Sequence, residues 1–383
     1  MNTQPTIAVV HASIGSGHRI AAESIAAELR LLRPDVRVEV LDILDFGVAR
    51  ISGNAATSAF TGPTAPLYDT LWGSARFGAS MMAISRPVLG LLYSAFTRWI
   101  AENHPDAIVA THALAANLAV RATRGGRLGG PPVIACATDF GLHGFWPTRG
   151  LARFCVADEA EAEELALRGT PETDIRVTGI PVRAQFEQHI DRADARVRLG
   201  LPAEHRVVLA LAGATQPGPY ERFKESLAVS LTLIASIPNT TVAVVTGRDD
   251  AYATDLRARV SGFGSTTVRV LGYVERMAEV MAAADIAVCK PGGLVTAECI
   301  AMQLPMVLIG PASGQERANV TALTAAGAAI YDEDPRRMAE FVRKALARSG
   351  QLARSKEATV ALARPGAALH VAETIAELLG WLA

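Results

Sequence analysis

A histidine that ends a glycine-bearing stretch near the N-terminus is the first residue with a side chain suited to acid or base chemistry. Gly15-Ser16-Gly17-His18 follows an apolar segment and runs straight into an alanine-rich one. A glycine-rich turn between a strand and a helix lets backbone N–H groups meet an anion or a developing charge. The histidine would point into the crevice at the strand carboxyl ends. His18 is therefore either a hydrogen-bonding residue at a helix start or a general base.

The same turn differs from the fingerprint of dinucleotide-binding proteins. The position of the third glycine in that fingerprint holds Ile20, and no Walker lysine follows the turn. The sequence therefore argues against a nicotinamide dinucleotide at this place.

A second polar segment, from Thr138 to Trp146, follows the apolar run Pro132–Ala137. It contains Asp139, His143 and Trp146. Because the segment follows a strand, its polar groups are expected to reach the same crevice. Two interpretations remain open: these residues belong to a site, or Asp139 caps the next turn and Trp146 is buried at the domain edge.

In the second half of the chain, Lys290–Glu298 again joins an expected strand to an expected helix. Gly292 and Gly293 allow an anion to approach closely, and the following helix presents free N–H donors to a phosphate. Glu298 has the chemistry to accept hydrogen bonds from ribose hydroxyls. The alternative is an ordinary tight turn with a solvated glutamate. Two more glycine-bearing loops, Gly213–Gly218 and Gly310–Glu316, follow strands of this half, and together the loops favour a nucleotide site.

Metal sites and disulfides find little support in the sequence. Asp332-Glu333-Asp334 contains an Asp-x-Asp spacing, but it precedes Pro335, and capping of the next helix explains it better. Cys136, Cys155, Cys289 and Cys299 are scattered in apolar surroundings and are expected to be reduced core residues. The remaining histidines lack ligand spacing and are interpreted as structural or exposed: His104, His112, His189, His205 and His370.

The elements that must position these residues alternate between short apolar runs and longer segments of helical period, which indicates parallel sheets covered on both faces. The expected strands of the first half are Thr6–Val10, Arg37–Leu41, Ala107–Ala110, Pro132–Ala137, Phe154–Ala157 and Ile175–Thr178. Those of the second half are Arg206–Ala212, Thr241–Thr246, Thr267–Leu271, Ile286–Cys289, Pro305–Ile309 and Ala328–Tyr331. The pattern predicts two doubly wound domains, residues 1–185 and 186–366, with an insertion of short helices at Arg50–Arg98.

Composition limits the possible partners and location. The chain has 383 residues, with 37 Lys and Arg against 38 Asp and Glu. This balance argues against nucleic acid, because a groove for a polyanion normally leaves a basic excess. The apolar stretch Ala79–Ile100 is broken by Arg86 and Arg98, which excludes a bilayer span but leaves attachment to a membrane surface open. The N-terminus lacks a signal sequence, so a cytoplasmic protein is expected.

Four separated motifs resemble one enzyme family, that of monogalactosyldiacylglycerol synthases and processive diacylglycerol glucosyltransferases (glycosyltransferase family 28). Gly15–His18 resembles the glycine-rich turn of the family, and Thr138-Asp139 with His143 and Trp146 resembles its TD…H..W segment. Two further motifs match its hinge and its donor signature: Thr178–Arg183, and Lys290–Glu298 with Gly314-Gln315-Glu316 and Asn319. The likeness covers nearly the whole chain in order.

The resemblance implies a GT-B fold, in which two Rossmann-like domains face each other across a cleft and a C-terminal helix, residues 367–383, crosses back to the first domain. It implies a UDP-sugar donor, no cofactor and no metal. His18 would be the general base, with Asp139 as the nearest candidate for a partner carboxylate, since Ser13 and Ile14 stand where the plant enzymes carry Asp. The implied donor-binding residues are Arg183, Gly213, Tyr273, Val274, Pro291, Gly292, Gly293, Leu294, Thr296, Glu298, Gln315, Glu316 and Asn319.

The function expected from these observations is inverting transfer of a hexose from a UDP-sugar to a membrane lipid, diacylglycerol in the first place. The alternatives are a polyprenyl-linked or secondary-metabolite acceptor, a sugar-nucleotide epimerase, and a nucleotide-binding protein without catalysis. The acceptor and the inner face of the cell membrane are expected to meet Tyr68, Trp72, Trp99, His143 and Trp146. The competing interpretation is that the aromatic residues of the insertion pack on the core of the first domain.

Overall fold

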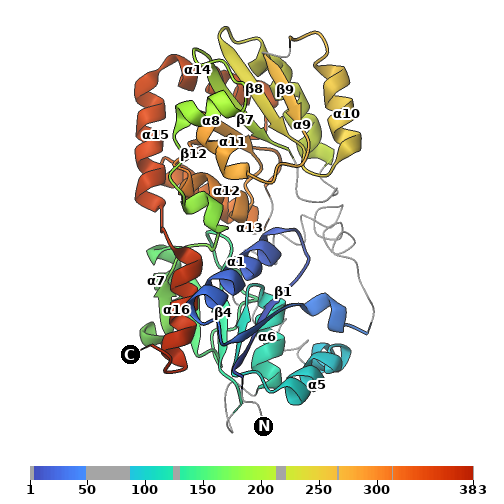
Figure 1. Cartoon of the computed structure of the whole chain (residues 1–383), viewed down its shortest axis with the longest axis vertical. Coiled ribbons are helices and arrows are strands. Elements are labelled where there is room, and N and C mark those ends of the chain that lie inside the picture. Colours follow the sequence, from blue (N-terminus) through green and yellow to red (C-terminus); the bar gives the residue numbers. More distant parts are fainter. Residues whose placement is uncertain are drawn as a thin grey trace. The chain divides into compact units, whose positions relative to one another are not determined.

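A computed structural model of the chain describes residues 4–48, 87–123, 130–212, 221–264, 267–312 and 314–382. The chain divides into two compact units (Figure 1). Unit 1 consists of Met1–Arg183 and Arg364–Ala383, and unit 2 of Ala184–Ala363. Three predicted site residues, Tyr68, Trp72 and Gly213, lie outside the described ranges.

Unit 1 is built on a parallel six-stranded sheet of order β2-β1-β3-β4-β5-β6. The strands in the middle of the sheet are almost fully buried because helices cover both faces, whereas the two edge strands are partly exposed. The strands are β1 (Thr6–His11), β2 (Arg37–Asp42), β3 (Ala107–Ala110), β4 (Val133–Cys136), β5 (Arg153–Val156) and β6 (Ile175–Val177). Because β1, β3 and β4 are neighbours, the loops that leave their carboxyl ends meet at one edge of the sheet.

Two helices distant in sequence cover one face of this sheet. In α1 (Gly17–Leu32), Ile25 and Leu29 pack with Val371 and Ile375 of α16 (Ala367–Leu378). The two helices lie side by side in Figure 1. The last residues of the chain therefore complete the core of unit 1. The other face carries three further helices of the described residues, α5 (Ser94–Asn103), α6 (Ala113–Ala122) and α7 (Glu159–Leu167).

Unit 2 repeats this architecture with the parallel strand order β12-β11-β10-β7-β8-β9. Its strands are β7 (Arg206–Leu211), β8 (Thr240–Val245), β9 (Val268–Leu271), β10 (Ile286–Cys289), β11 (Met306–Ile309) and β12 (Ala329–Asp332). Its helices are α8 (Arg192–Arg198), α9 (Glu221–Ala235), α10 (Asp250–Arg259), α11 (Met277–Ala283), α12 (Gly293–Ala301), α13 (Gln315–Ala325), α14 (Pro335–Ala347) and α15 (Ser349–Leu362). Short 3₁₀ helices lie at Ile43–Phe46 and Glu172–Asp174 in unit 1 and at Ala184–Glu187 in unit 2.

Every strand predicted from the sequence is present, and its observed ends differ from the expected ones by a single residue at most. The first helix begins at Gly17, within the glycine-rich turn. The last helix ends at Leu378, before Gly380, whose φ of +67° is unsuited to a continuing helix.

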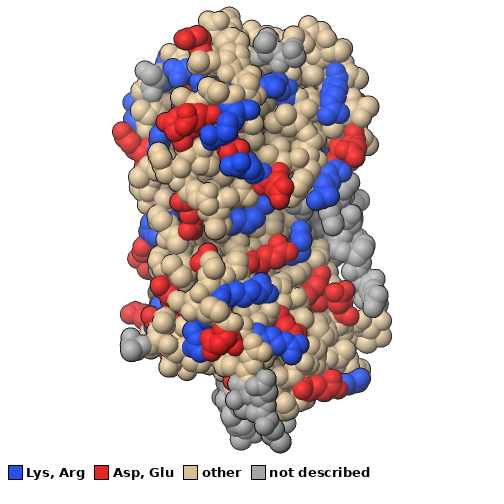
Figure 2. All heavy atoms as spheres, in the orientation of Figure 1, with Lys and Arg blue, Asp and Glu red and all other residues tan. Residues whose placement is uncertain are grey.

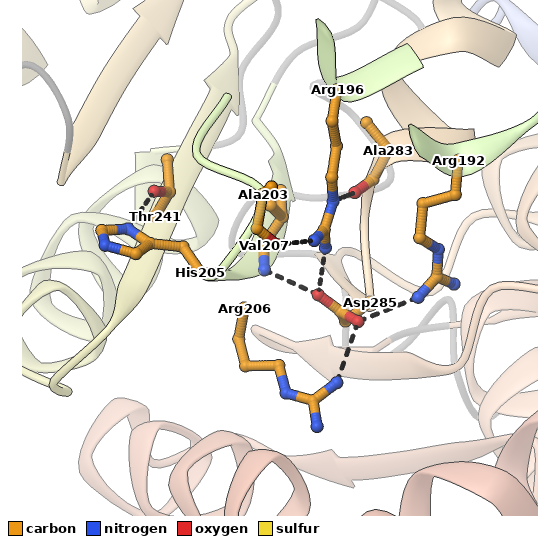
Figure 3. A network of polar contacts seen from close by, with 9 residues as sticks. All are labelled: Arg192, Arg196, Ala203, His205, Arg206, Val207, Thr241, Ala283 and Asp285. Carbon is orange, nitrogen blue, oxygen red and sulfur yellow. Dashed lines mark hydrogen bonds and ion pairs between the residues drawn. The ribbon is translucent and has the colours of Figure 1, made fainter. Parts of the chain in front are cut away.

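Charge is mixed over the surface. Figure 2 shows Lys, Arg, Asp and Glu side chains interspersed over the face in view, and the formal net charge is −1. A dense ionic cluster lies in unit 2 at the start of β10, the edge of the sheet opposite to the strand carboxyl ends (Figure 3).

Asp285 is the centre of this cluster. Its side chain is only 4% exposed and accepts from Arg196 at 2.7 Å and Arg192 at 2.9 Å. It also accepts from the backbone N–H of Val207 at 2.7 Å, and Arg206 lies 3.4 Å away. One carboxylate therefore ties α8 to the first residues of β7 and β10 (Figure 3).

Removing this carboxylate should destabilise unit 2. Asp285→Ala leaves Arg196 and the Val207 N–H without their acceptor, and breaking a buried pair costs about 3 kcal/mol. For a unit of this size the midpoint of thermal unfolding should fall by roughly 6–12 °C in calorimetry. Asp255→Ala is the matched control, because Asp255 pairs with Arg259 at 2.8 Å while both side chains are more than 40% exposed, so its loss should cost under about 1 kcal/mol. Equal shifts in both variants would contradict the structural role of Asp285.

Candidate active site

His18 lies in the first turn of α1, one short loop after β1. The loop turns at Gly15, which has a φ of +79°, a conformation that favours glycine. Ser16 occupies the N-cap position without a side-chain cap. The backbone thus carries His18 to the edge of the sheet where the strand carboxyl ends meet.

Two hydrogen-bond partners fix the ring of His18, both at its Nδ1 atom. The backbone carbonyl of Thr111 lies 2.9 Å from Nδ1, and the hydroxyl of Thr138 lies 2.8 Å from it. A carbonyl oxygen can only accept, so the neutral ring carries its proton on Nδ1 and donates to Thr111. The Thr138 hydroxyl shares this proton as a second acceptor. Nε2 therefore keeps its lone pair, as a general base requires.

The order of the strands explains why these residues meet. Thr111 directly follows β3 and Thr138 follows β4, while β3 lies between β1 and β4 in the sheet. The Thr111 hydroxyl also donates to the backbone carbonyl of His18 at 2.9 Å. Thr111 thus holds both the backbone and the ring of His18.

Burial keeps this ring neutral. Loss of hydration lowers the pKa of His18 to about 4, and the nearby His11 lowers it further, while the Thr111 carbonyl acts in the opposite direction. At neutral pH the base form is therefore fully populated.

The expected carboxylate partner is not bonded to His18. Among the described residues, the hydrogen bonds of His18 are those to Thr111 and Thr138. The role of Asp139, the nearest candidate from the sequence, therefore stays a prediction. A backbone carbonyl orients the ring where other enzymes use Asp or Glu.

His112, which the sequence analysis interprets as structural or exposed, is a close neighbour of His18. Its ring packs edge to face on that of His18, with 4.7 Å between centroids and an angle of 84°. His112 follows β3 just as Thr138 follows β4. Its position shortly after an apolar run indicated that it lies at the carboxyl end of a strand. Its proximity to His18 follows from the strand order, in which β3 is the neighbour of β1.

The segment from Thr138 to Trp146 forms one wall of the site. Trp146 is buried against Phe154, with 5.3 Å between ring centroids, and its other neighbour is His143 at 5.9 Å. Arg168 of unit 1 donates to the carbonyls of Leu142 and His143, both at 3.3 Å. Trp146 therefore supports this segment from the core of unit 1. Burial lowers the pKa of the neighbouring His143, and positive charge on Arg168 and on His18 lowers it further.

In unit 2, the loop after β10 leads into α12 and forms the predicted anion site. Gly292 is the N-cap of α12 and no side chain caps the helix. The Thr296 hydroxyl donates inward, to the carbonyls of Gly292 and Gly293 at 2.9 Å each. The first N–H groups of α12 thus remain available to an anion.

The protein itself does not need glycine at position 292. Its φ is −81°, and an added Cβ would meet only ordinary contacts, with Lys290 at 3.5 Å and Val295 at 3.7 Å. A side chain at this position would instead cover the end of the helix. Among the described residues, no contact therefore accounts for glycine at this position.

The next loop supports the first one. Buried Asn319 of α13 donates to the carbonyl of Pro291 at 2.9 Å, and Lys290 forms an ion pair with Glu316. Gly314, with a φ of +54°, begins α13 without a side-chain cap. Asn319 and Thr296, both predicted to bind the donor, thus shape the loop, and Glu316 pairs with Lys290.

The remaining donor candidates occupy several places in unit 2. Glu298 is buried in the second turn of α12, and Leu294 and Gln315 are half-buried at the starts of α12 and α13. Tyr273 follows β9 and is 44% exposed. The guanidinium carbon of Arg248 lies 4.3 Å from the centroid of its ring. Val274, the next residue, is half-buried. Arg183, by contrast, is the last residue of the first segment of unit 1.

Trp99, predicted to face acceptor or membrane, packs instead on the core of unit 1. Its ring stacks on Phe96 at 6.5 Å and meets Phe46 at 6.4 Å. The exposed apolar side chains of this region belong to Val48, Val88, Leu91 and Leu92, which we call the apolar rim. The backbone N–H of Val48 donates to the carbonyl of Leu92 at 3.0 Å, which brings the two segments of the rim together.

Capping explains the Asp-x-Asp segment, since Asp334 accepts from the backbone N–H of Arg336 at 2.8 Å at the start of α14. In the described part of the chain, no three His, Cys, Asp or Glu side chains are grouped as metal ligands would be. Within the same ranges, no helix combines the length and the apolar character that crossing a bilayer requires.

The neutral histidines should make unit 1 sensitive to acid. Burial is the main cause that lowers the pKa of His11, His18, His112 and His143 in the folded state. The unfolded chain takes up protons near pH 6.5, so stability is full above that pH and falls as the pH drops towards 4. Each histidine contributes a slope of up to about 1.4 kcal/mol per pH unit.

Urea denaturation at pH 7.5, 6 and 5, followed by tryptophan fluorescence, measures this dependence, because all four tryptophans fall within the residue ranges of unit 1. His112→Asn should flatten the slope, whereas His189→Asn, a change of an exposed histidine in unit 2, should not. A midpoint that does not change between pH 7.5 and 5 would contradict the prediction.

Two family models match the chain, one in each half. The model described as Monogalactosyldiacylglycerol (MGDG) synthase matches residues 18–182. The Glycosyltransferase family 28 C-terminal domain matches residues 219–375. The first match begins at His18, and the second includes all of α12 and α13.

Curated relatives match over part of their length. A processive diacylglycerol beta-glucosyltransferase of Bacillus cytotoxicus is 31% identical over 246 residues, 64% of this chain and 62% of the relative. The Bacillus subtilis (strain 168) enzyme of the same name is 32% identical over 256 residues, 67% of this chain and 64% of the relative. The matched segment thus spans somewhat less than two thirds of these relatives.

Solved structures with the GT-B architecture match nearly end to end. MurG of Acinetobacter baumannii has a TM-score of 0.61 at 17% identity and covers 97% of this chain and 99% of its own. HepE of Anabaena, solved with UDP and glucose, has a TM-score of 0.57 at 16% identity and covers 99% and 100%. The fold is therefore GT-B, and the chain belongs to the glycosyltransferase family 28 group that contains the monogalactosyldiacylglycerol synthases and processive diacylglycerol glucosyltransferases.

Proposed function

We propose that the protein is an inverting glycosyltransferase that moves a hexose from a UDP-sugar to diacylglycerol. The observation that carries this proposal is the ring of His18, whose Nδ1 proton is fixed by the Thr111 carbonyl and whose Nε2 lone pair is therefore a ready base. The relatives named diacylglycerol glucosyltransferases support the substrate class.

Unit 2 offers the chemistry that a UDP-sugar needs. The uncapped first turn of α12 presents N–H groups and the positive end of the helix dipole to a diphosphate. Glu298 provides a carboxylate for the ribose hydroxyls, and Tyr273 with Val274 a platform for the uracil. By resemblance, Arg183 adds a guanidinium for the diphosphate. Binding of UDP by the structural neighbour HepE agrees with this assignment.

The surroundings of His18 favour a neutral acceptor. The groups that shift the pKa of His18 and His112 are burial, the Thr111 backbone and neighbouring histidines, and neither ring has a Lys or Arg among them. A polyprenyl diphosphate would bring two negative charges to a site whose histidines are uncharged. The hydroxyl of diacylglycerol carries no such charge, which favours it over the polyprenyl-linked alternative.

The reaction that fits these residues is a single displacement. Nε2 of His18 takes the proton of the acceptor hydroxyl while its oxygen attacks the anomeric carbon of the sugar. The bond from that carbon to the β-phosphate oxygen breaks, and UDP leaves with its new charge near the N-terminus of α12. The configuration at the anomeric carbon is inverted. We propose that no metal takes part.

Transfer of labelled hexose tests the proposal. The protein is incubated with UDP-glucose or UDP-galactose and diacylglycerol, with and without EDTA, and the lipid product is identified by mass spectrometry. Product of inverted configuration that is insensitive to EDTA supports it. Conversion of UDP-GlcNAc without acceptor would favour an epimerase, and UDP binding without turnover on any acceptor would favour a protein that only binds nucleotide.

His18→Ala should reduce turnover more than donor affinity. General-base catalysis contributes about 10²–10⁴-fold, so kcat should fall by that factor while the Kd of UDP measured by calorimetry barely changes. Because the pKa of His18 is about 4, the acid limb of kcat/KM in the wild type should lie well below pH 6.5. His189→Ala serves as the control. Near-normal turnover in His18→Ala would contradict the role of His18 and favour His143 or Asp139 as the general base.

We also propose that the protein binds peripherally to the inner face of the cell membrane through the apolar rim. Val88, Leu91 and Leu92 lie in a helical segment, residues 87–92, with the spacing that places them on one side. Val48 and Leu91 are more than 70% exposed, an arrangement suited to burial in a lipid surface.

Replacing the centre of the rim should weaken membrane binding. Val88→Gln with Leu91→Gln removes two apolar contacts, each worth about 1.5–3 kcal/mol when fully buried. Sedimentation with phosphatidylcholine vesicles containing diacylglycerol should therefore fall by at least about tenfold. Leu167→Gln is the control, because Leu167 is 90% exposed at the end of α7, away from the rim in sequence. Unchanged sedimentation of the double variant would refute the assignment of the rim.

A further inference from the structure

We propose that His112 is a second acceptor-binding residue, which donates a hydrogen bond from Nε2 to an oxygen next to the hydroxyl that reacts. The inference rests on the proposed function, in which His18 deprotonates that hydroxyl. It adds a specificity-determining side chain to the site.

The protonation state of His112 follows from its role as the N-cap of α6. The backbone N–H of Leu114 donates to Nδ1 of His112 at 3.1 Å, and the φ and ψ of His112 are −142° and 142°, as expected for a cap. An amide N–H can only donate, so Nδ1 of His112 carries no proton. A neutral His112 therefore has its proton on Nε2, the reverse of the arrangement in His18.

The surroundings also keep His112 neutral. It is packed against His18, and burial together with positive charge on His18, His143 or His11 would disfavour its protonation. Its side chain is nevertheless only half-buried. Among the described residues, none accepts a hydrogen bond from its Nε2.

Two neighbouring rings thus present complementary groups. His18 offers a lone pair on Nε2 and His112 an N–H on Nε2, with ring centroids 4.7 Å apart. A ligand that satisfies both has a hydroxyl beside an acceptor oxygen. Diacylglycerol has this pattern, because an ester oxygen is attached to the carbon adjacent to the one that bears the free hydroxyl. A simple long-chain alcohol has the hydroxyl alone.

Discrimination between two acceptors tests the proposal. One is diacylglycerol, and the other is an analogue in which the ester oxygen beside the hydroxyl carbon is replaced by methylene. His112→Ser keeps a good N-cap but removes the Nε2 donor. It should lower kcat/KM for diacylglycerol by roughly 5–100-fold and leave that for the analogue nearly unchanged. His112→Asn keeps both a cap and an N–H donor and should recover part of the discrimination.

A structural role alone gives a different pattern. Equal losses on both acceptors in His112→Ser, or no loss on either, would overturn the proposal. The Kd of UDP should be the same in all variants.

A measurement without turnover separates this proposal from the proposed function. Nitrogen-15 NMR of the histidine rings at pH 7, assigned with His112→Asn, should find His112 protonated on Nε2 and His18 on Nδ1. The opposite tautomer of His112 would overturn the inference whatever the acceptor is. Failure of the wild type to glycosylate either acceptor, with these tautomers observed, would overturn the proposed function and the acceptor assignment with it.

Discussion

A neutral imidazole has one proton to place, and in this protein the backbone carbonyl of Thr111 decides where the proton of His18 lies. The hydrogen bond is possible because β1 and β3 are neighbours and because Gly15 turns the chain into α1 at the right point. Burial removes the competing charged form of the ring. The same edge of the sheet brings Thr138 to Nδ1 from β4. No carboxylate is needed to orient the base when a rigid backbone group does so.

The strands of both units could be predicted from the sequence because their apolar runs are short, rich in Val, Ile and Ala, and separated by segments of helical period. The contacts among loops could not, because strand order is a property of the sheet. Thr111 and His112 are 93 and 94 positions from His18, and nothing in their spacing indicates that they meet it. The edge position of a residue such as Asp139 is predictable, but the partner of its side chain is not.

The donor loops illustrate the same division. The glycines were recognisable in the sequence, and the structure adds that no contact with a described residue requires glycine at position 292. The direction of the polar side chains was not predictable. Thr296 and Asn319 resemble ligand-binding residues in the sequence, yet both bond to backbone carbonyls of the loop, at Gly292 and Pro291. These bonds fix the shape of the loop, and a role of both residues in donor binding stays a prediction.

The two units solve opposite electrostatic problems with the same fold. In the proposed reaction, unit 2 attracts a diphosphate with helix N–H groups, which cost no desolvation of a charged side chain. We propose that unit 1 takes a proton from a hydroxyl that is a very weak acid, and a base for this step has to be uncharged before the reaction and able to carry charge during it. Burial of His18 among other neutral histidines meets the first requirement, whereas the Thr111 carbonyl, which raises the pKa of His18, meets the second. A charged residue in place of His112 would disturb this balance, which is a physical reason for a second histidine at that position.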